Sequence, residues 1–287
     1  MKKLFSLFTL TILAFSAVYA DECEATYGVA SVTFTRDGSQ YKAGHFSVSE
    51  TKSVKFSPAN LAYTEANGFY FFENQYDYSR NIGDVYDLFT YGASGYDGKT
   101  PTGSSYAIGD IDNTNYDWGV YNSIKHTKGG QTTTYDAGVW RTLTWSEWNY
   151  LSNQRTNHAF LITGAKVNGI YGIILLPDDW VAPENLPNMV PSLPFRDIPE
   201  EGTVNKYTSS EWSIFENAGA VFIPALGDSD GHFDPSAGTV TYCCYWSSKQ
   251  SSDTQAKRAD FGNEDRGVRE VDAGKGIKSS VRLVQDW

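Results

Sequence analysis

Two short stretches, Leu143-Thr144-Trp145-Ser146-Glu147-Trp148 and Tyr207-Thr208-Ser209-Ser210-Glu211-Trp212, decide the fold because they carry the same helix-start signal. In each stretch a threonine can cap the first turn, and a glutamate three residues later completes a capping box. The apolar residues at the two ends of each stretch occupy the positions of a hydrophobic staple. Gly219 is placed to end the second helix after Asn217-Ala218. We predict one short helix at each stretch and little other regular helix.

The other apolar runs are short and typical of strands. An Asn168-Gly169 pair between two of these runs predicts a hairpin turn. The chain has 8 Trp, 19 Tyr, 16 Phe and 26 Gly, a composition that favours rings filling the space between short elements. We expect an α+β fold in which two short helices pack on short, mostly antiparallel sheets joined by long irregular loops. The expected strands are residues 29–35, 46–48, 53–56, 69–72, 167, 170–176, 220–225, 240–247, 256–261 and 279–284.

Two polar segments are expected to form long loops. Residues 177–199 carry six prolines, which exclude a helix or a central strand there. Residues 92–131 are rich in Gly, Ser, Thr, Asn, Asp and Tyr, a composition typical of loops. Each segment is open to two interpretations, contact with a ligand or cover over a core.

The first 20 residues have the three parts of a secretory signal peptide. Lys2 and Lys3 form the positive region, residues 4–18 are apolar without a charge, and Val18-Tyr19-Ala20 supplies the small residues of a cleavage site. A membrane anchor is the alternative, but the run is short for ~30 Å of hydrocarbon and no stop-transfer pattern follows. Asp21-Glu22 before Cys23 does not fit lipoprotein processing. We expect cleavage after Ala20 and a product that is secreted or located at the cell surface.

The mature chain is acidic. Removing residues 1–20 takes away two lysines and no acid, so the net charge goes from −11 to −13. A chain this negative lacks the basic surface that nucleic acid requires and is repelled by anionic membranes. No later apolar run approaches the ~18 residues of a transmembrane helix. We therefore expect neither a nucleic-acid partner nor a transmembrane segment in the mature chain.

Three cysteines are too few for a disulfide framework, and their odd number leaves at least one thiol unpaired. The expected pairing joins Cys23 to Cys243 or to Cys244, which would fix the N-terminus to the body of the chain. A bond between the adjacent Cys243 and Cys244 is the strained alternative.

A set of short blocks runs along most of the chain. The blocks are Phe46-Ser47-Val48-Ser49, Val54-Lys55-Phe56-Ser57, Asn60-Leu61, Gln75-Tyr76-Asp77, Asp87-Leu88-Phe89, Trp140-Arg141-Thr142-Leu143-Thr144 with Glu147-Trp148, Leu175-Leu176-Pro177-Asp178-Asp179-Trp180, Gly219-Ala220-Val221-Phe222-Ile223-Pro224-Ala225, Tyr245-Trp246-Ser247-Ser248 and Ser280-Val281-Arg282-Leu283-Val284. This set resembles the Fibrobacter succinogenes major paralogous domain, because the blocks occur in the order of that family and cover about residues 44–284. With the signal peptide expected at 1–20, the resemblance implies an N-terminal extension at 21–43 and one domain at 44–287.

That family is similar to the formylglycine-generating-enzyme branch of C-type-lectin-like folds, so the resemblance implies a C-type-lectin-like fold. It does not carry an activity over to this chain. The enzymes hold copper with two cysteines separated by several residues, whereas Cys243 and Cys244 are adjacent. The calcium motifs of sugar-binding C-type lectins, Glu-Pro-Asn or Gln-Pro-Asp with Trp-Asn-Asp, do not occur in the sequence.

No cofactor is expected, and calcium is the one candidate metal. Asp228, Asp230 and Asp234 have part of the spacing of an oxygen-ligand calcium loop, but Thr239 stands where that loop needs a glutamate. A solvated turn is the alternative. A similar group is formed by Asp110, Asp112 and Asp117. Four histidines, His45, His126, His158 and His232, have no pair at metal-ligand spacing.

The charge-rich residues 249–278 lie between the Tyr245-Trp246-Ser247-Ser248 block and the closing strand, so their side chains are expected to line one exposed face. In lectin-like folds this region forms the ligand-binding face. An ordinary solvated loop face is the alternative. The residues expected to contact a ligand are Trp246, Lys249, Asp253, Lys257, Arg258, Asp260, Glu264, Arg266 and Arg269.

These features together predict an exported, non-catalytic protein that binds carbohydrate or a cell-surface protein. Two rival functions stay open. One is an extracellular enzyme of the formylglycine-generating-enzyme-like superfamily, which requires a deep pocket with convergent carboxylates or a metal. The other is a structural or adhesion component of the cell surface.

Overall fold

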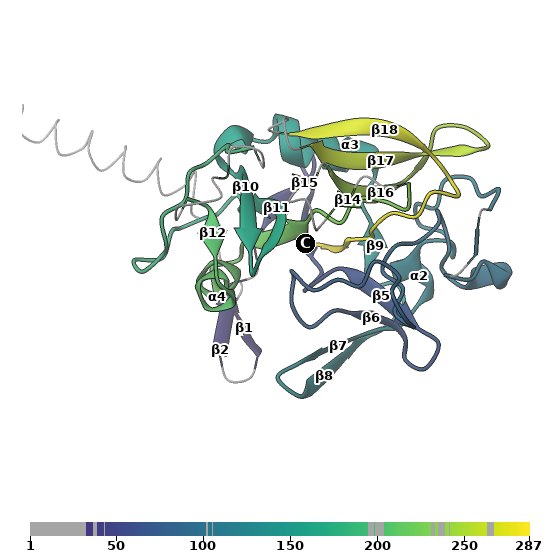
Figure 1. The fold of residues 1–287 in the computed structure, drawn as a ribbon, viewed down its shortest axis with the longest axis horizontal. Helices are drawn as coiled ribbons and strands as arrows, with labels where there is room; N and C mark the ends of the chain where they lie inside the picture. The colour runs from purple at the N-terminus through teal and green to yellow at the C-terminus, as the bar shows by residue number, and fades with distance from the viewer. Residues whose placement is uncertain are drawn as a thin grey trace, which may run out of the picture.

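The chain forms an α+β fold of few short helices and several small sheets, as the sequence predicts (Figure 1). The structure is a computed structural model that describes residues 33–36, 39–42, 44–101, 103–104, 106–194, 198, 204–230, 233–234, 239–240, 242–262 and 267–287. In this part of the chain, no helix has the length and apolar character needed to cross a membrane.

The helical elements are η1 (Tyr96–Gly98), α2 (Trp118–Tyr121), α3 (Trp145–Asn149), η2 (Tyr150–Gln154), η3 (His158–Phe160) and α4 (Ser209–Asn217). The strands are β1 (Thr33–Arg36), β2 (Ser39–Lys42), β3 (Phe46–Ser47), β4 (Ser53–Phe56), β5 (Leu61–Thr64), β6 (Gly68–Phe71), β7 (Ile124–Lys128), β8 (Gln131–Tyr135), β9 (Arg141–Thr142), β10 (Ile162–Val167), β11 (Ile170–Leu175), β12 (Lys206–Tyr207), β13 (Val221–Pro224), β14 (Phe233–Asp234), β15 (Thr239–Val240), β16 (Tyr242–Gln250), β17 (Gln255–Gly262), β18 (Val268–Gly274) and β19 (Leu283–Asp286).

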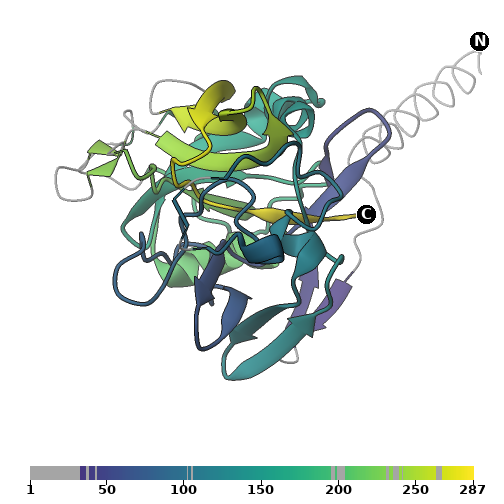
Figure 2. The same cartoon turned by 90° about the vertical axis from the view of Figure 1, so that its right-hand side faces the viewer.

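Most strands belong to four sheets. Their orders are β12-β10-β11-β13, β3-β4-β19-β9, β5-β6-β7-β8 and β16-β17-β18, and most neighbouring strands are antiparallel. The pairs β10–β12 and β6–β7 are parallel. Helix α4 and the β10 sheet lie at one end of the long axis, α2 lies at the other end, and β16-β17-β18 runs along one side (Figure 1). The last strand, β19, runs through the middle of the molecule (Figure 2).

Both predicted helices begin at their capping boxes. Thr144 accepts a hydrogen bond from the Glu147 backbone N–H at the start of α3, and Thr208 does the same for Glu211 at the start of α4. In both cases the glutamate side chain accepts from the N–H of the capping threonine. Gly219 has a φ of 96°, a conformation that favours glycine, and follows the last turn of α4. The staple partners Leu143, Trp148, Tyr207 and Trp212 are all buried.

The predicted hairpin at Asn168-Gly169 is confirmed, because both residues have positive φ and join β10 to β11. The proline-rich segment forms neither helix nor strand in its described residues 177–194 and 198. The prediction of residues 92–131 as loop alone is wrong, because the segment contains η1, α2 and the strand β7, which forms a hairpin with β8. Residues 249–278 also contain a strand that was not predicted, β18, which pairs with β17. Its charged side chains do not show the apolar pattern of a strand.

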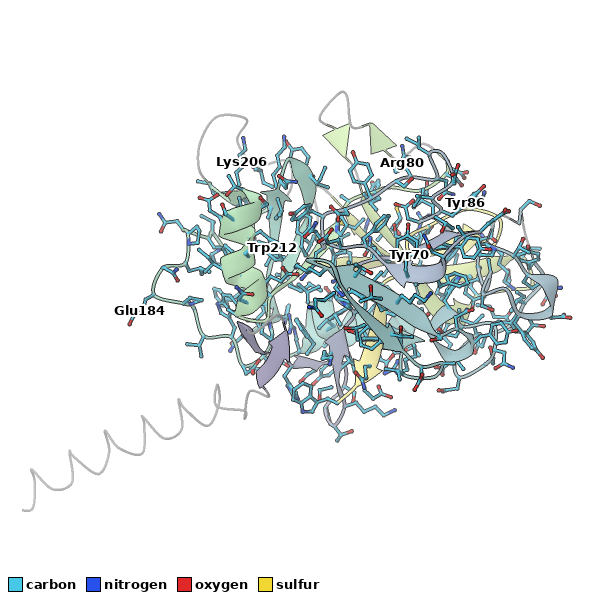
Figure 3. The ribbon with its side chains drawn as sticks, turned by 90° about the horizontal axis from the view of Figure 1, so that it is seen from below. Tyr70, Arg80, Tyr86, Glu184, Lys206 and Trp212 are labelled. Carbon is cyan, nitrogen blue, oxygen red and sulfur yellow. The ribbon has the colours of Figure 1, made fainter. Side chains whose placement is uncertain are left out.

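One strand supplies rings to two separate parts of the core. Successive side chains of β16 project to opposite faces, so Tyr245 packs in a cluster with Trp148 and Phe261, while Trp246 packs in another with Phe89. A third cluster lies under α4, where Trp212 stacks on Phe215 (Figure 3). These contacts make β16 the strand that joins the first two clusters.

A polar network crosses the centre of the molecule. Arg282, which is fully buried, donates from Nη1 to Asn60 Oδ1 at 3.3 Å and from Nη2 to Gln75 Oε1 at 3.2 Å. Asn60 Nδ2 donates to the Tyr245 hydroxyl at 2.9 Å, and that hydroxyl donates to the Pro224 carbonyl at 2.8 Å. Burial lowers the pKa of Arg282 to about 10.

The same network reaches the surface through Glu216 of α4. Gln75 Nε2 donates to Glu216 Oε1 at 3.1 Å, and Lys128 Nζ of β7 donates to Glu216 Oε2 at 2.9 Å. Asn60, Gln75, Tyr245 and Arg282 belong to separate blocks on which the family resemblance rests. In this structure those blocks meet at a shared interior network.

Candidate functional site

The predicted exposed face at residues 249–278 does not form as one surface. Trp246 is 0% exposed and donates from Nε1 to the Phe89 carbonyl at 2.7 Å. Arg258 and Asp260 are 4% and 3% exposed, and Lys275 from the same segment is also buried. The prediction of an exposed face is therefore wrong for Trp246, Arg258 and Asp260, because β16 and β17 are buried over most of their length and hold these side chains in the interior.

Arg258 is the centre of a buried ion network. It donates from Nε and Nη2 to the two carboxylate oxygens of Asp260 at 2.6 and 2.8 Å. Its Nη1 donates to Asp228 Oδ2 at 2.7 Å and to the Ser279 hydroxyl at 3.3 Å. A bidentate guanidinium–carboxylate pair of this kind is a strong interaction when both partners are buried and fully bonded. Arg258 therefore holds β17 to the segment before β19, and its charge is satisfied within the fold.

The other predicted ligand residues lie at different places. Lys257 pairs with Glu270 across β17 and β18, and Arg269 lies over the Tyr242 ring at 4.9 Å. Asp253 is exposed at the turn between β16 and β17. Glu264 and Arg266 lie outside the described residues. Lys249 is on β16, in the same sheet as Lys257 and Arg269, but it lies at the end of that strand, next to the turn that carries Asp253.

The aspartates of the predicted calcium loop have other positions and partners in the structure. Asp228 is buried and paired with Arg258, while its Oδ1 accepts from the Asp230 backbone N–H at 2.9 Å. Asp230 is exposed in the turn that follows, and the side chain of Asp234 lies outside the described part of the chain. Among the described residues, no three His, Cys, Asp or Glu side chains are grouped so that they could hold a metal ion.

The two adjacent cysteines are buried free thiols. Burial raises the pKa of both Cys243 and Cys244 well above its usual value, so neither thiol is activated as a nucleophile. Cys23, the predicted disulfide partner, lies outside the described residues.

Lys249 connects the charge-rich segment 249–278 to the polar, tyrosine-rich segment 92–131. Its Nζ lies 3.1 Å from Asp110 Oδ2 and 3.4 Å from Asp112 Oδ2. Burial acts to lower the pKa of Lys249, but the hydrogen bond and charge of Asp110 outweigh it, and the pKa is raised. The Ile111 N–H also donates to the Ser248 carbonyl at 2.9 Å. Residues 108–117 are therefore fastened to the end of β16.

Three tyrosines from two segments of the chain form what we call the tyrosine ledge: Tyr96 in η1, Tyr116 just before α2 and Tyr121 in α2. The Tyr96 ring centroid lies 5.1 Å from that of Tyr116 and 5.2 Å from that of Tyr121, with the planes at 78° and 68°. Tyr121 is 42% exposed, and the other two are half-buried. Edge-to-face contacts of this kind orient the rings while leaving ring surface in contact with solvent.

Hydrogen bonds hold together the segments that carry the tyrosine ledge. Trp118, fully buried, donates from Nε1 to the Ala93 carbonyl at 3.0 Å. Asn122 Nδ2 donates to the Ser94 carbonyl at 2.9 Å, and the Ser94 hydroxyl donates to the Asn115 carbonyl at 2.7 Å. These bonds join residues 93–94, which precede Tyr96, to residues 115–122, which carry Tyr116 and Tyr121. The rings are consequently held in place before any ligand arrives.

Asp117 anchors the ledge to the core. Its Oδ1 accepts from the Gly119 N–H at 3.0 Å, which caps α2, and its Oδ2 accepts from the Thr142 N–H at 2.8 Å. Burial raises the pKa of Asp117 to about 6. The sequence grouped Asp117 with Asp110 and Asp112 as oxygen ligands, whereas in the structure its carboxylate caps its own helix and binds the backbone of β9.

Sequence reasoning named Lys249 but missed the three tyrosines. The three tyrosines belong to residues 92–131, which were predicted as a loop from their composition. The one sequence signal for a site there was the spacing of these tyrosines among glycines and aspartates. What no sequence pattern shows is that η1, the 111–117 turn and α2 fold against one another. The arrangement offers ring faces, hydroxyls and carboxylates to a ligand. Comparison of the chain with protein-family models, curated proteins and solved structures gave no match.

Proposed function

We propose that this chain is an exported, non-catalytic protein that binds carbohydrate at the tyrosine ledge. The observation that carries the proposal is the fixed, partly exposed arrangement of Tyr96, Tyr116 and Tyr121 on two cross-bonded segments, residues 94–98 and 115–122. Export is supported by the charge, apolar and small-residue regions of residues 1–20.

Carbohydrate suits this surface for two physical reasons. A sugar ring has an apolar face of C–H groups that can pack on an aromatic ring, and tyrosine offers such a face with little rotamer entropy to lose. Sugar hydroxyls also need hydrogen-bond partners, and ionised carboxylates accept such bonds strongly. Asp97, which follows Tyr96 and accepts a hydrogen bond from the Tyr116 hydroxyl, is in position to supply one.

The same proposal includes a C-type-lectin-like fold of the Fibrobacter succinogenes major paralogous domain type. Its support is the pair of capped helices with a closing strand near the centre, together with the convergence of the resemblance blocks on the Arg282 network. Relative to the prediction from sequence, the proposed ligand site moves away from the face of β17 and β18. It stays connected to that region through Lys249.

A glycan and protein array probed with residues 21–287 tests the proposal. We expect retention on carbohydrate features, and we expect Tyr96→Ala and Tyr121→Ala to lower it about 5- to 150-fold together, since stacking contacts contribute about 0.5–1.5 kcal/mol each. Phe160→Ala is the matched control, because Phe160 is 65% exposed on η3, which packs on the β10 end. Retention on protein features alone, or equal loss in the control, would contradict the proposal.

A further inference from the structure

One strand, β8, forms an open sheet edge at the rim of the molecule. It is the last strand of β5-β6-β7-β8 in the described part of the chain, and its hairpin with β7 lies at the lower rim in both views (Figures 1 and 2). The two-residue turn between them makes Lys128 and Gln131 a hydrogen-bonded pair, and such pairs alternate along an antiparallel ladder. Thr127 and Thr132 are then a non-hydrogen-bonded pair, in agreement with the 2.8 Å between their hydroxyl oxygens. The backbone N–H and C=O groups of Thr132 and Thr134 therefore point away from β7, to the side where the sheet ends.

The side chains of β8 do not prevent pairing with a further strand. Its sequence, Gln131-Thr132-Thr133-Thr134-Tyr135, contains no charge, no proline and no glycine, and all but the tyrosine are exposed. The ladder with β7 runs without a bulge, and threonine and tyrosine favour the extended backbone. Exposed edges of natural sheets usually carry a charge, a proline or a bulge that blocks strand addition. Since β8 has none of these, it is suited to accept another strand.

Three other sheet edges of the molecule are covered or charged. At β5, the opposite edge of the same sheet, Tyr63 and Tyr86 exchange two backbone hydrogen bonds of 2.7 and 2.9 Å. At β16, the Trp246 N–H donates to the Ser280 carbonyl at 3.1 Å. The third edge, β18, has three charged side chains among its seven residues, which discourage pairing. The uncharged, uncovered edge of β8 differs from all three.

We infer that β8 pairs antiparallel with β8 of a second copy of this chain, across a two-fold axis at Thr133. Thr132 of each copy then lies opposite Thr134 of the other, and each of these symmetric pairs exchanges both of its backbone hydrogen bonds. The two four-stranded sheets thereby join into one continuous sheet. This inference goes beyond the proposed carbohydrate binding and does not depend on it.

A second copy fits this edge because of its sequence and its charge. The stretch is nearly symmetric about Thr133, so the pairing places threonine opposite threonine and Gln131 opposite Tyr135. Cross-strand threonine pairs are favourable, and no like charges lie directly opposite each other. The mature chain is acidic, so two copies repel each other in general, whereas an uncharged edge allows their backbones to approach. An interface confined to one edge buries less than about 1,200 Å², which predicts a weak and reversible dimer.

Sedimentation equilibrium of residues 21–287 measures the association. We expect a dissociation constant on the order of 100 µM, and a smaller one in about 1 M salt, because screening weakens the repulsion between two acidic chains. Thr133→Lys places like charges directly opposite each other across the axis and should raise the dissociation constant about tenfold. Thr127→Lys is the matched control, since it adds the same charge at an exposed position of β7, and it should change the constant less than about twofold.

Thr133→Cys tests the register and changes the side chain little, so it serves even if the lysine variant fails to fold. Opposed residues of a non-hydrogen-bonded pair have Cα atoms about 4.5 Å apart, within the range of a disulfide. Under mild oxidation we expect a cross-linked dimer whose peptide map joins position 133 of one copy to position 133 of the other. Thr127→Cys and the natural chain, in which Cys243 and Cys244 are buried, should lack this product.

Three results would overturn the inference. The first is a natural chain that stays monomeric up to about 1 mM, which would leave an extended segment of another protein as the occupant of the edge. The second is a dimer that both lysine variants weaken equally or that neither weakens. The third is cross-linking of Thr127→Cys as fast as that of Thr133→Cys.

Discussion

Arg258 and Arg282 show how differently one residue type can be used inside a fold. Arg258 is bonded to two carboxylates, so its charge is neutralised where it lies. Arg282 is bonded to the amide oxygens of Asn60 and Gln75. Both residues stand in segments that sequence alone presents as polar or closing elements, and burial decides their roles. A charged residue between two strands is not evidence of an exposed binding face until its partners are known.

Replacing Arg258 tests whether it is structural. Arg258→Ala leaves Asp228 and Asp260 buried without their cation, and we expect the free energy of unfolding to fall by about 3–5 kcal/mol. Lys257→Ala, on the same strand but half-exposed, should cost less than ~1 kcal/mol. Urea unfolding measures both. Unchanged stability with lost glycan binding would show instead that Arg258 contacts the ligand.

Asp117 gives a pH-dependent contribution to stability with a definite sign. Burial raises its pKa from 3.8 to about 6, so between about pH 4 and pH 6 the folded chain holds a proton that the unfolded chain has released. This group therefore makes the free energy of unfolding fall as the pH rises through that window. The change in pKa corresponds to on the order of 3 kcal/mol.

The measurement is the unfolding free energy of the natural chain minus that of Asp117→Asn, at several values between pH 4 and pH 7. We expect this difference to decrease up to about pH 6 and then to level off, because the variant lacks the titrating carboxyl group. A difference that stays constant or increases with pH would show that Asp117 is not a buried acid of raised pKa.

At the scale of elements, the sequence predicts those features that depend on residues close together in the chain. The boxes at Thr144 and Thr208 fixed the starts of α3 and α4, and Asn168-Gly169 fixed a hairpin. Strands β8 and β18 were missed because their side chains are mostly polar and exposed, so they lack the apolar alternation that marks a half-buried strand. Backbone pairing with β7 and β17 holds them in place, and no pattern within each segment reports it.

The capping box of α3 can be tested directly. Thr144→Ala removes the acceptor for the Glu147 N–H and should cost about 1 kcal/mol, which corresponds to a melting temperature about 2–4 °C lower for a chain of this size. Ser146→Ala, at an exposed position in the same first turn, should change stability by less than ~0.5 kcal/mol. Calorimetric melting of both variants decides the matter, and equal shifts would contradict the capping role.

At the scale of the whole molecule, the candidate site depends on contacts between distant parts of the chain. Lys249 was predicted as a ligand residue, yet its partners Asp110 and Asp112 come from a segment that the sequence marked only as polar loop. Tyr96, Tyr116 and Tyr121 meet because Trp118 and Asn122 donate hydrogen bonds to Ala93 and Ser94, which precede Tyr96. Composition identified the residues available for binding, but only the tertiary arrangement shows which of them share a surface.

Hydrogen–deuterium exchange of residues 21–287, with and without a saturating glycan from the array, tests the location of the site most directly. We expect slower exchange in peptides covering residues 94–98 and 115–122 and unchanged exchange in residues 177–194. The reason is that ligand contact and loop ordering are confined to the tyrosine ledge. Slower exchange only in the peptides of β17 and β18, with none at the ledge, would contradict it.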